Sequence, residues 1–253
     1  MSGEDSSNGP GAGQSGLGNS VLRAMGPADW QALEAHVEAL TLAAGDVLAE
    51  PGQPIRHVYF PLTAVASVVT LMSDGREVES DTVGLESGVG LLSALGDSVA
   101  VSRAFIQIPG RAARIRAPIL RRQAEASQSL RRIMIRHAQA NLSQAHQSVA
   151  CNALHSLNER LCRWLLMSQD RTGGDVVRLT HEFLATMLGV QRSTVSEALR
   201  AMADAGLVRQ RRGAIEILDR PQLEAAVCEC YAAVKANLAL LIGPEFADDD
   251  AAG

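Results

Sequence analysis

Hydrogen-bonding side chains suited to the edges of DNA bases gather on one face of a helix that the sequence predicts from Arg192 onward. At about 100° per residue, the polar face carries Arg192, Ser193, Ser196, Glu197, Arg200 and Asp204. An arginine can donate to guanine O6 and N7, a glutamate can accept from cytosine N4, and a serine can do either. The opposite face is apolar, with Val195, Ala198, Leu199, Met202 and Ala205. The pattern therefore indicates a helix that packs by one face and reads a duplex groove by the other.

A shorter predicted helix precedes this one and an arginine-rich segment follows it. Thr180 is a suitable N-cap, and Phe183, Leu184, Met187 and Leu188 have core spacing. Gly189 lies where a tight turn between two helices needs an unhindered backbone. Arg209, Arg211 and Arg212 surround a hairpin tip at Gly213 and are suited to phosphate oxygens. The stretch from Leu179 to Leu218 thus predicts a helix-turn-helix with a β-wing; an ordinary helical hairpin with a solvated polar face is the alternative.

Two separated regions resemble the Crp/Fnr regulators, the family of the cyclic-AMP receptor and the fumarate-nitrate regulator. The run Gly-Val-Gln-Arg-Ser-Thr-Val-Ser at 189–196 and Ala-Gly-Leu-Val at 205–208 resemble its recognition helix and wing entry. Ala-Gly-Asp-Val-Leu at 44–48 and the stretch 51–60 resemble the opening strands of its sensor barrel. The resemblance covers roughly residues 21–241 in the family's domain order.

Turn signals at short intervals between Gly45 and Ile115 independently predict an antiparallel barrel or jelly roll. Ser73-Asp74-Gly75 predicts one of its hairpins. The expected architecture is α+β: a disordered segment at 1–20, a sensor β-barrel domain at 21–117 with helical sequence over 21–42, a dimerisation helix at 118–150, a winged helix-turn-helix domain at 151–220, and a C-terminal helix from Pro221 to about Leu241 within an acidic-tailed segment, 221–253.

A long apolar stripe on the predicted 118–150 helix is typical of a coiled-coil seam, although the helix could instead pack only on its own barrel. The predicted homodimer interface comprises Leu130, Met134, Ala138, Asn141, Leu142, Ala145 and Val149. In the resembled family this helix also closes an effector pocket. The pocket residues so implied are Gly88, Val89, Gly90, Ser102, Arg103, His137 and Asn141.

Comparison with the family's cyclic-AMP cassette argues against that nucleotide. Where the cassette has a Gly-Glu pair this chain has Val89 or a neighbour, and the Arg-Ser order is reversed as Ser102-Arg103. An apolar side chain cannot accept from a ribose hydroxyl, and a one-residue shift on a strand turns a side chain to the other face. No cysteine precedes Cys151, so the family's iron–sulfur cluster is not expected, whereas haem stays an open alternative.

The resemblance implies a DNA-binding transcriptional regulator, acting as a homodimer on a palindromic operator with half-sites ~34 Å apart. We expect Arg192 to read a guanine, and Ser193, Ser196 and Glu197 to read or position neighbouring bases. Phosphates are assigned to Thr180, His181, Arg200, Arg209, Arg211 and Arg212, and Gln191 and Thr194 complete the surface. The other expected partners are RNA polymerase and a small-molecule effector. A protein-binding adaptor without DNA binding and a haem or redox sensor are the alternatives.

Bulk composition limits the remaining possibilities. The net charge of the 253 residues is −5, so affinity for DNA must come from local basic groups. No apolar run is long enough for a membrane span and the first residues do not resemble a signal peptide, so we expect a cytoplasmic protein. A cupin-type enzyme would need clustered histidine ligands, and the barrel sequence holds only His57. No catalytic residue and no metal site is predicted.

The four cysteines are interpreted as small buried hydrophobes. Cys228 and Cys230 lie two apart on the predicted last helix, about 200° apart around its axis, so they could not both face one metal ion unless the helix unwinds.

Overall fold

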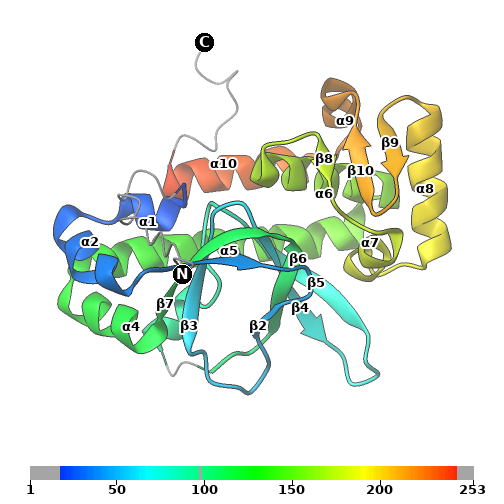
Figure 1. The fold of residues 1–253 in the computed structure, drawn as a ribbon. Helices are drawn as coiled ribbons and strands as arrows, with labels where there is room; N and C mark the ends of the chain where they lie inside the picture. Colours follow the sequence, from blue (N-terminus) through cyan, green and yellow to red (C-terminus); the bar gives the residue numbers. More distant parts are fainter. Residues whose placement is uncertain (1–17, 97–98, 244–253) are drawn as a thin grey trace, which may run out of the picture.

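Two antiparallel sheets form the predicted sensor half of the chain (Figure 1). The computed structural model describes residues 18–96 and 99–243. One sheet has the order β1-β7-β3 and the other β2-β6-β4-β5. Alanines and branched residues of β4 and β6 pack against Leu42 and Ala112 between the two sheets. The strands are β1 (Glu38–Leu42), β2 (Val47–Ala49), β3 (His57–Pro61), β4 (Val65–Leu71), β5 (Glu77–Val83), β6 (Arg103–Ile108) and β7 (Gly110–Arg116). The predicted jelly-roll architecture is confirmed.

The predicted hairpin at Ser73-Asp74-Gly75 joins β4 to β5. The two strands pair in antiparallel register from Ala66 opposite Val83 to Leu71 opposite Glu77. Gly75 has a φ of +85°, a region that glycine enters without the steric penalty of a side chain. Local turn chemistry therefore suffices to place this hairpin.

The N-terminal part differs from the sequence prediction in two places. Helices α1 (Ser20–Ala24) and α2 (Pro27–Leu33) and the 3-10 turn η2 (Glu34–His36) are helical as expected, but 38–42 forms β1. The helical prediction for 37–42 is wrong because this segment pairs with β7, about seventy residues away.

Residues 1–17 of the predicted disordered segment 1–20 lie outside the described part of the chain. The last residues of that segment, 19 and 20, are ordered. Asn19 is fully buried, and its Nδ2 donates to the carbonyl oxygens of Pro61 and Ser87 at 2.9 and 2.8 Å. Its Oδ1 accepts from the Val21 amide as the N-cap of α1. Disorder is therefore the wrong prediction for 19–20.

The predicted single helix over 118–150 is two helices, α4 (Ala117–Ala126) and α5 (Gln128–Leu154). Ser127 between them has an extended backbone and accepts from the Leu130 amide as the N-cap of α5. Its hydroxyl also donates to buried Asp29 of α2 at 2.9 Å. This long-range bond and the cap hold the break, which periodicity alone does not reveal.

A second core holds the C-terminal domain together. Helix α6 (Leu157–Thr172) begins with a capping box between Ser156 and Glu159. It packs with α7 (His181–Leu188), α8 (Arg192–Asp204) and a small sheet in the order β8-β10-β9. The sheet strands are β8 (Val176–Val177), β9 (Val208–Arg211) and β10 (Ala214–Ile217). This core also reaches β4 and β6 of the sensor through Val65, Val69 and Ile108.

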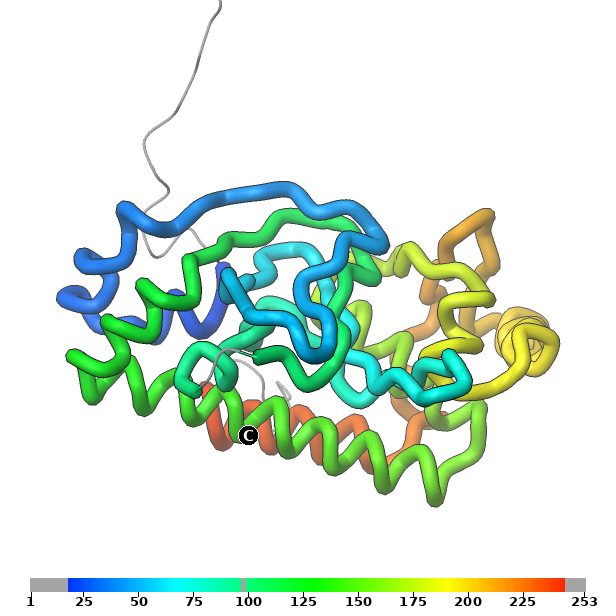
Figure 2. Tube along the Cα trace, turned by 90° about the horizontal axis from the view of Figure 1, so that it is seen from below, coloured from blue at the N-terminus to red at the C-terminus, as the bar shows by residue number. Residues whose placement is uncertain are grey.

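The predicted last helix is also broken. It consists of α9 (Arg220–Ala226) and α10 (Cys230–Ile242), and the chain bends by 102° between them. Helix α10 runs back along α5, as both ribbon and tube views show (Figures 1 and 2). Among the described helices, none by itself is long and apolar enough to cross a membrane; α9 and α10 meet that length and composition only as a bent pair.

Candidate nucleic-acid interface

Helix α8 presents the predicted recognition face to solvent. Val195, Leu199 and Met202 are buried against the domain core. The Arg192 side chain is 69% exposed, at the first position of the helix. No described side chain caps the N-terminus of α8, which therefore adds the positive end of the helix dipole to this surface. Outside the wing, the other predicted contacts that are exposed are Thr180, Gln191, Ser193, Thr194, Glu197 and Arg200.

His181 and Ser196 lie between α7 and α8. His181 Nδ1 and Ser196 Oγ are 2.9 Å apart, and the Ser196 hydroxyl also lies 2.9 Å from the Arg192 carbonyl oxygen. Both side chains are half-buried. In this structure they tie the two helices together, whereas the sequence assigned His181 to a phosphate and Ser196 to a base.

The turn between the helices is built on Gly189. Its φ is +66°, and its amide closes α7 by donating to the Thr186 carbonyl. Thr180 opens the same helix, with its hydroxyl accepting from the Phe183 amide at 3.1 Å. The predicted cap and turn are confirmed, and they set the angle at which α8 projects.

The wing carries three exposed arginines, two of which share one carboxylate. Arg209 and Arg211 lie 3.1 and 2.7 Å from Glu216 of the adjacent strand β10. The Arg211 hydrogen bond and the two positive charges lower the pKa of Glu216. Arg212 makes no ion pair with any described residue. Only part of the wing's positive charge is therefore uncompensated.

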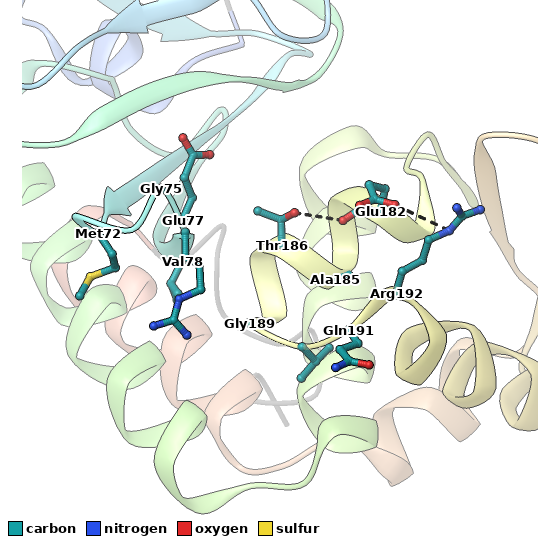
Figure 3. A pocket seen from close by; sticks show the side chains of 12 residues that line it. Met72, Gly75, Glu77, Val78, Glu182, Ala185, Thr186, Gly189, Gln191 and Arg192 are labelled. Atoms are coloured by element: carbon teal, nitrogen blue, oxygen red, sulfur yellow. Dashed lines mark hydrogen bonds and ion pairs between the residues drawn. The ribbon is translucent and has the colours of Figure 1, made fainter.

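A cleft of about 910 Å³ separates the start of α8 from the β4–β5 hairpin (Figure 3). Val78 and Met72 line the sensor side, and Thr186 and Gln191 line the other. Farther inside, Phe183 of α7 contacts Phe105 and Trp164 edge-on, with ring centroids 6.1 and 6.0 Å away. Helix α7 therefore rests against the N-terminal sheets, with the β4–β5 hairpin beside the start of α8.

A second cavity, of about 320 Å³, lies between the sensor sheet and α5. It is lined by five of the seven predicted effector residues: Gly88, Val89, Gly90, Ser102 and Asn141. Apolar side chains and small hydroxyls make up most of the wall, and Asp81 is an acidic member. Burial raises the pKa of Asp81 to about 8, against the opposing charge of Arg171.

Two predicted pocket residues point elsewhere. Arg103 forms ion pairs with Glu77 at 2.6 Å and Glu50 at 3.2 Å. His137 is buried, with Nδ1 2.8 Å from the Glu86 carbonyl oxygen. Neither lines the cavity, because both already have partners on other elements.

A buried polar bridge, which the sequence did not reveal, connects this region to the DNA-binding domain. The guanidinium of Arg171 on α6 donates to Glu86 at 2.8 Å and to Gln144 of α5 at 2.8 Å. It also donates to the carbonyl oxygens of Thr82 and Met167. Gln144 in turn donates to Asp81, which lines the cavity. No local pattern distinguishes such an arginine from a solvated one.

The outer face of α5 has an exposed apolar stripe that coincides in part with the predicted dimer seam. Ile135, Leu142 and Val149 are 43%, 57% and 68% exposed and recur every seven residues. Ala138 and Ala145, half-buried, occupy the intervening positions of the heptad. Leu130 and Met134 are fully buried in their own protomer, so placing them in a seam was wrong. Ile135 lies seven residues before Leu142, and this spacing in the sequence could have indicated that Ile135 belongs to the exposed stripe.

Comparisons with known proteins agree with this geometry. Residues 159–226 match the Crp-like helix-turn-helix domain. A Crp/Fnr transcriptional regulator from Eubacterium rectale has 19% identity and a TM-score of 0.64, over 81% of this chain and 96% of that one. A CRP/FNR regulator from Thermus thermophilus has 22% identity and a TM-score of 0.60, over 75% and 97%.

The c-di-GMP responsive global regulator CLP of Xanthomonas campestris has 16% identity and a TM-score of 0.62, over 77% of this chain and all of that one (100%). A search of curated protein sequences found no match. The chain therefore contains a Crp-like helix-turn-helix domain, and it shares the fold of the solved Crp/Fnr regulators.

Proposed function

We propose that this regulator works as a homodimer that reads a palindromic operator with the N-terminal half of α8. The exposed Arg192, Ser193 and Glu197, adjacent to an arginine-bearing wing, carry this proposal. Arg192 reads a guanine, Ser193 and Glu197 address neighbouring bases, and Thr180, Arg200 and the wing arginines hold phosphates. The target sequence is set by this combination of side chains.

Support for the dimer comes from the a and d positions of α5. Ile135, Leu142 and Val149 would alternate with Ala138 and Ala145 across a parallel pair of helices. The same helix walls the sensor cavity through Ala138 and Leu142. A second copy would therefore cover both an exposed apolar stripe and one side of the cavity.

The cavity is proposed to hold a small uncharged effector. Its described lining contains no arginine or lysine to neutralise a phosphate, and Asp81 would repel one if ionised. Val89 cannot accept from a ribose hydroxyl. We therefore propose that cyclic AMP is not the effector; saturable micromolar binding in titration calorimetry would refute this. The described lining also contains no histidine or cysteine that could hold haem or an iron–sulfur cluster.

The first experiment is selection from a random DNA pool by the purified, ligand-free protein, followed by sequencing. Enrichment of one palindrome supports the dimeric reader and shows that no added effector is needed. Sequence-blind binding in the free protein would mean that the cavity must be filled first, and the selection is then repeated with fractionated metabolites. A single, non-repeated half-site would contradict the dimer.

Two exposed arginines provide a matched pair of variants. Arg192→Ala should weaken binding to the selected site by ~1–3 kcal/mol and relax specificity at one base pair. Arg212→Ala should weaken all sequences alike, because a wing arginine meets phosphates. Equal losses on cognate and random DNA for both variants would show that the proposed roles are wrong.

We further propose that the protein has no enzymatic activity, that it acts on cytoplasmic DNA, and that it contacts RNA polymerase at its promoters. The support for these three roles is the Crp-like helix-turn-helix domain and the regulator fold, because DNA-binding regulators have such roles. A protein-binding adaptor remains the second candidate. If the protein is an adaptor, its affinity for DNA should depend little on salt concentration. If the arginines contact phosphates, the affinity should fall steeply as the salt concentration rises.

A further inference from the structure

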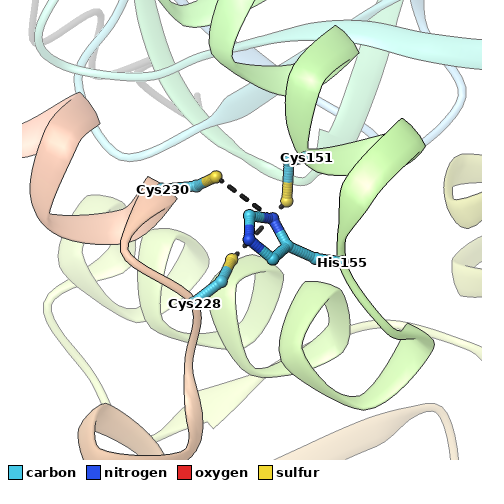
Figure 4. A group of neighbouring side chains, drawn as sticks. All are labelled: Cys151, His155, Cys228 and Cys230. Carbon is cyan, nitrogen blue, oxygen red and sulfur yellow. Dashed lines mark hydrogen bonds between the residues drawn. The ribbon is translucent and has the colours of Figure 1, made fainter.

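Three cysteines and a histidine, which the DNA-reading and sensor surfaces do not use, converge at the end of α5 (Figure 4). Cys151 and His155 come from the last turn of α5 and its C-cap, four residues apart on one face. Cys228 comes from the connection between α9 and α10, and Cys230 is the first residue of α10. One ligand atom from each lies within 4.8 Å of all the others.

The break between α9 and α10 makes this convergence possible. Continuous helix would have placed Cys228 and Cys230 on nearly opposite faces, as the sequence led us to expect. Instead Cys228 lies in non-helical backbone and Cys230 is the first residue of α10. The interruption of the helix that a shared metal ion would require is therefore present.

The spacing of the ligand atoms matches a tetrahedral zinc site. Bond lengths of ~2.3 Å to sulfur and ~2.0–2.1 Å to nitrogen, at a tetrahedral angle, separate two sulfurs by ~3.8 Å and a sulfur and a nitrogen by ~3.6 Å. Cys151 Sγ and Cys228 Sγ are 3.6 Å apart. Cys230 Sγ and His155 Nδ1 are 3.5 Å apart. A disulfide between Cys151 and Cys228 would need their sulfurs at ~2.0 Å.

Outer groups orient two of the four ligands. Glu229 Oε2 lies 3.2 Å from His155 Nε2, which leaves Nδ1 directed at the cluster. Gln147 Nε2 donates to Cys230 Sγ at 3.0 Å. A carboxylate on the distal histidine nitrogen and an amide donor to the sulfur are the usual supports of a metal-bound histidine and thiolate.

We propose that Cys151, His155, Cys228 and Cys230 bind one Zn²⁺ in a closed, structural site. Three cysteines and one histidine form a standard structural zinc set, and four protein ligands leave no position open for catalysis. The three cysteines are 0%, 4% and 1% exposed, which also shields the site from exchange.

Binding replaces three thiol protons, which are released to solvent, so the filled site carries one negative charge. Arg160 and Arg163 on α6 both interact electrostatically with Cys151. The buried Nε atoms of these two arginines have no hydrogen-bond partner among the described residues. Their positive charge is therefore available to balance the filled site.

The position of the site gives it a consequence for the fold. His155 separates α5 from α6, so it lies at the joint between the sensor half and the DNA-binding domain. The other two ligands begin α10, which packs along α5. A bound ion would clamp the C-terminal helix to this joint.

The test uses the full-length protein purified without chelator or affinity metal. We expect one equivalent of zinc per chain by elemental mass spectrometry. After removal by chelator under reducing conditions, Co²⁺ should produce the visible absorption of a tetrahedral thiolate site, and Zn²⁺ should displace it. Absence of both zinc and the Co²⁺ spectrum would overturn the proposal, as would a Cys151–Cys228 disulfide found by mass mapping of the freshly purified protein.

Variants separate the site from general cysteine chemistry. Cys228→Ser should abolish stoichiometric zinc, whereas Cys162→Ser, a buried cysteine in a different cluster, should keep it. Glu229→Gln tests the outer support without removing a ligand and should weaken zinc affinity ~10–100-fold in competition with a chromophoric chelator. Wild-type zinc content and affinity in Cys228→Ser would refute the assignment, and circular dichroism checks that each variant is folded.

Discussion

Replacing Arg171 by methionine should destabilise the protein far more than removing an exposed ion pair. The Arg171 and Glu86 side chains are each 5% exposed, and their closest atoms are 2.8 Å apart. Methionine keeps most of the volume of the arginine stem but leaves the Glu86 carboxylate buried without its charge partner. Removing one member of such a pair costs ~3–5 kcal/mol.

The matched control is Arg114→Met in the sensor sheet. Arg114 lies 2.7 Å from Glu38, but the two side chains are 34% and 53% exposed. Solvent-exposed pairs contribute only ~0–1 kcal/mol. We expect urea unfolding, followed by fluorescence of Trp30 and Trp164, to separate the two variants by at least ~2 kcal/mol.

A double variant tests the mechanism of the loss. If the uncompensated charge of Glu86 causes the destabilisation, Arg171→Met with Glu86→Gln should be more stable than Arg171→Met alone. Arg171→Met unfolding within ~1 kcal/mol of wild type, or a fully additive double variant, would refute the reasoning from the buried bridge.

Three further changes have defined outcomes. Leu142→Glu should convert the proposed dimer to monomers in light scattering, whereas Leu240→Glu, at a still more exposed position on α10 (77% against 57%), should not. Glu216→Gln frees Arg209 and Arg211, so DNA affinity should rise for every sequence and the slope of log K against log salt should steepen by up to ~0.9. Burial raises the pKa of Asp81 from 3.8 to about 8, so the folded state holds a proton that the unfolded state has released. Stability should therefore fall as pH rises through this window, by at most ~1.4 kcal/mol per unit, and Asp81→Asn should flatten the urea-midpoint profile there; an unchanged profile would contradict the assignment.

Elements specified by local pattern were predicted well from the sequence. The apolar face of α8, the Thr180 cap, the Gly189 turn and the β4–β5 hairpin each depend on residues within one or two turns of each other. Periodicity and turn chemistry report such short-range geometry directly. The exposed polar face of α8 followed from the same pattern.

Long-range contacts decided what the sequence misjudged. Segment 38–42 is a strand because β7 pairs with it, and Ser127 interrupts a helix where it meets Asp29. Arg103 and His137 do not line the predicted pocket, because Arg103 pairs with Glu77 and His137 contacts the Glu86 carbonyl oxygen.

The sequence by itself determined the order of the domains, the amphipathic recognition helix and the wing, since these depend on neighbours along the chain. Only the tertiary structure decided that Arg171 is buried and that Cys151, His155, Cys228 and Cys230 meet. The physical reason is that a break of a few residues after α9 re-aims every side chain beyond it, and the energy that holds the break comes from packing against α5, about eighty residues earlier in the chain.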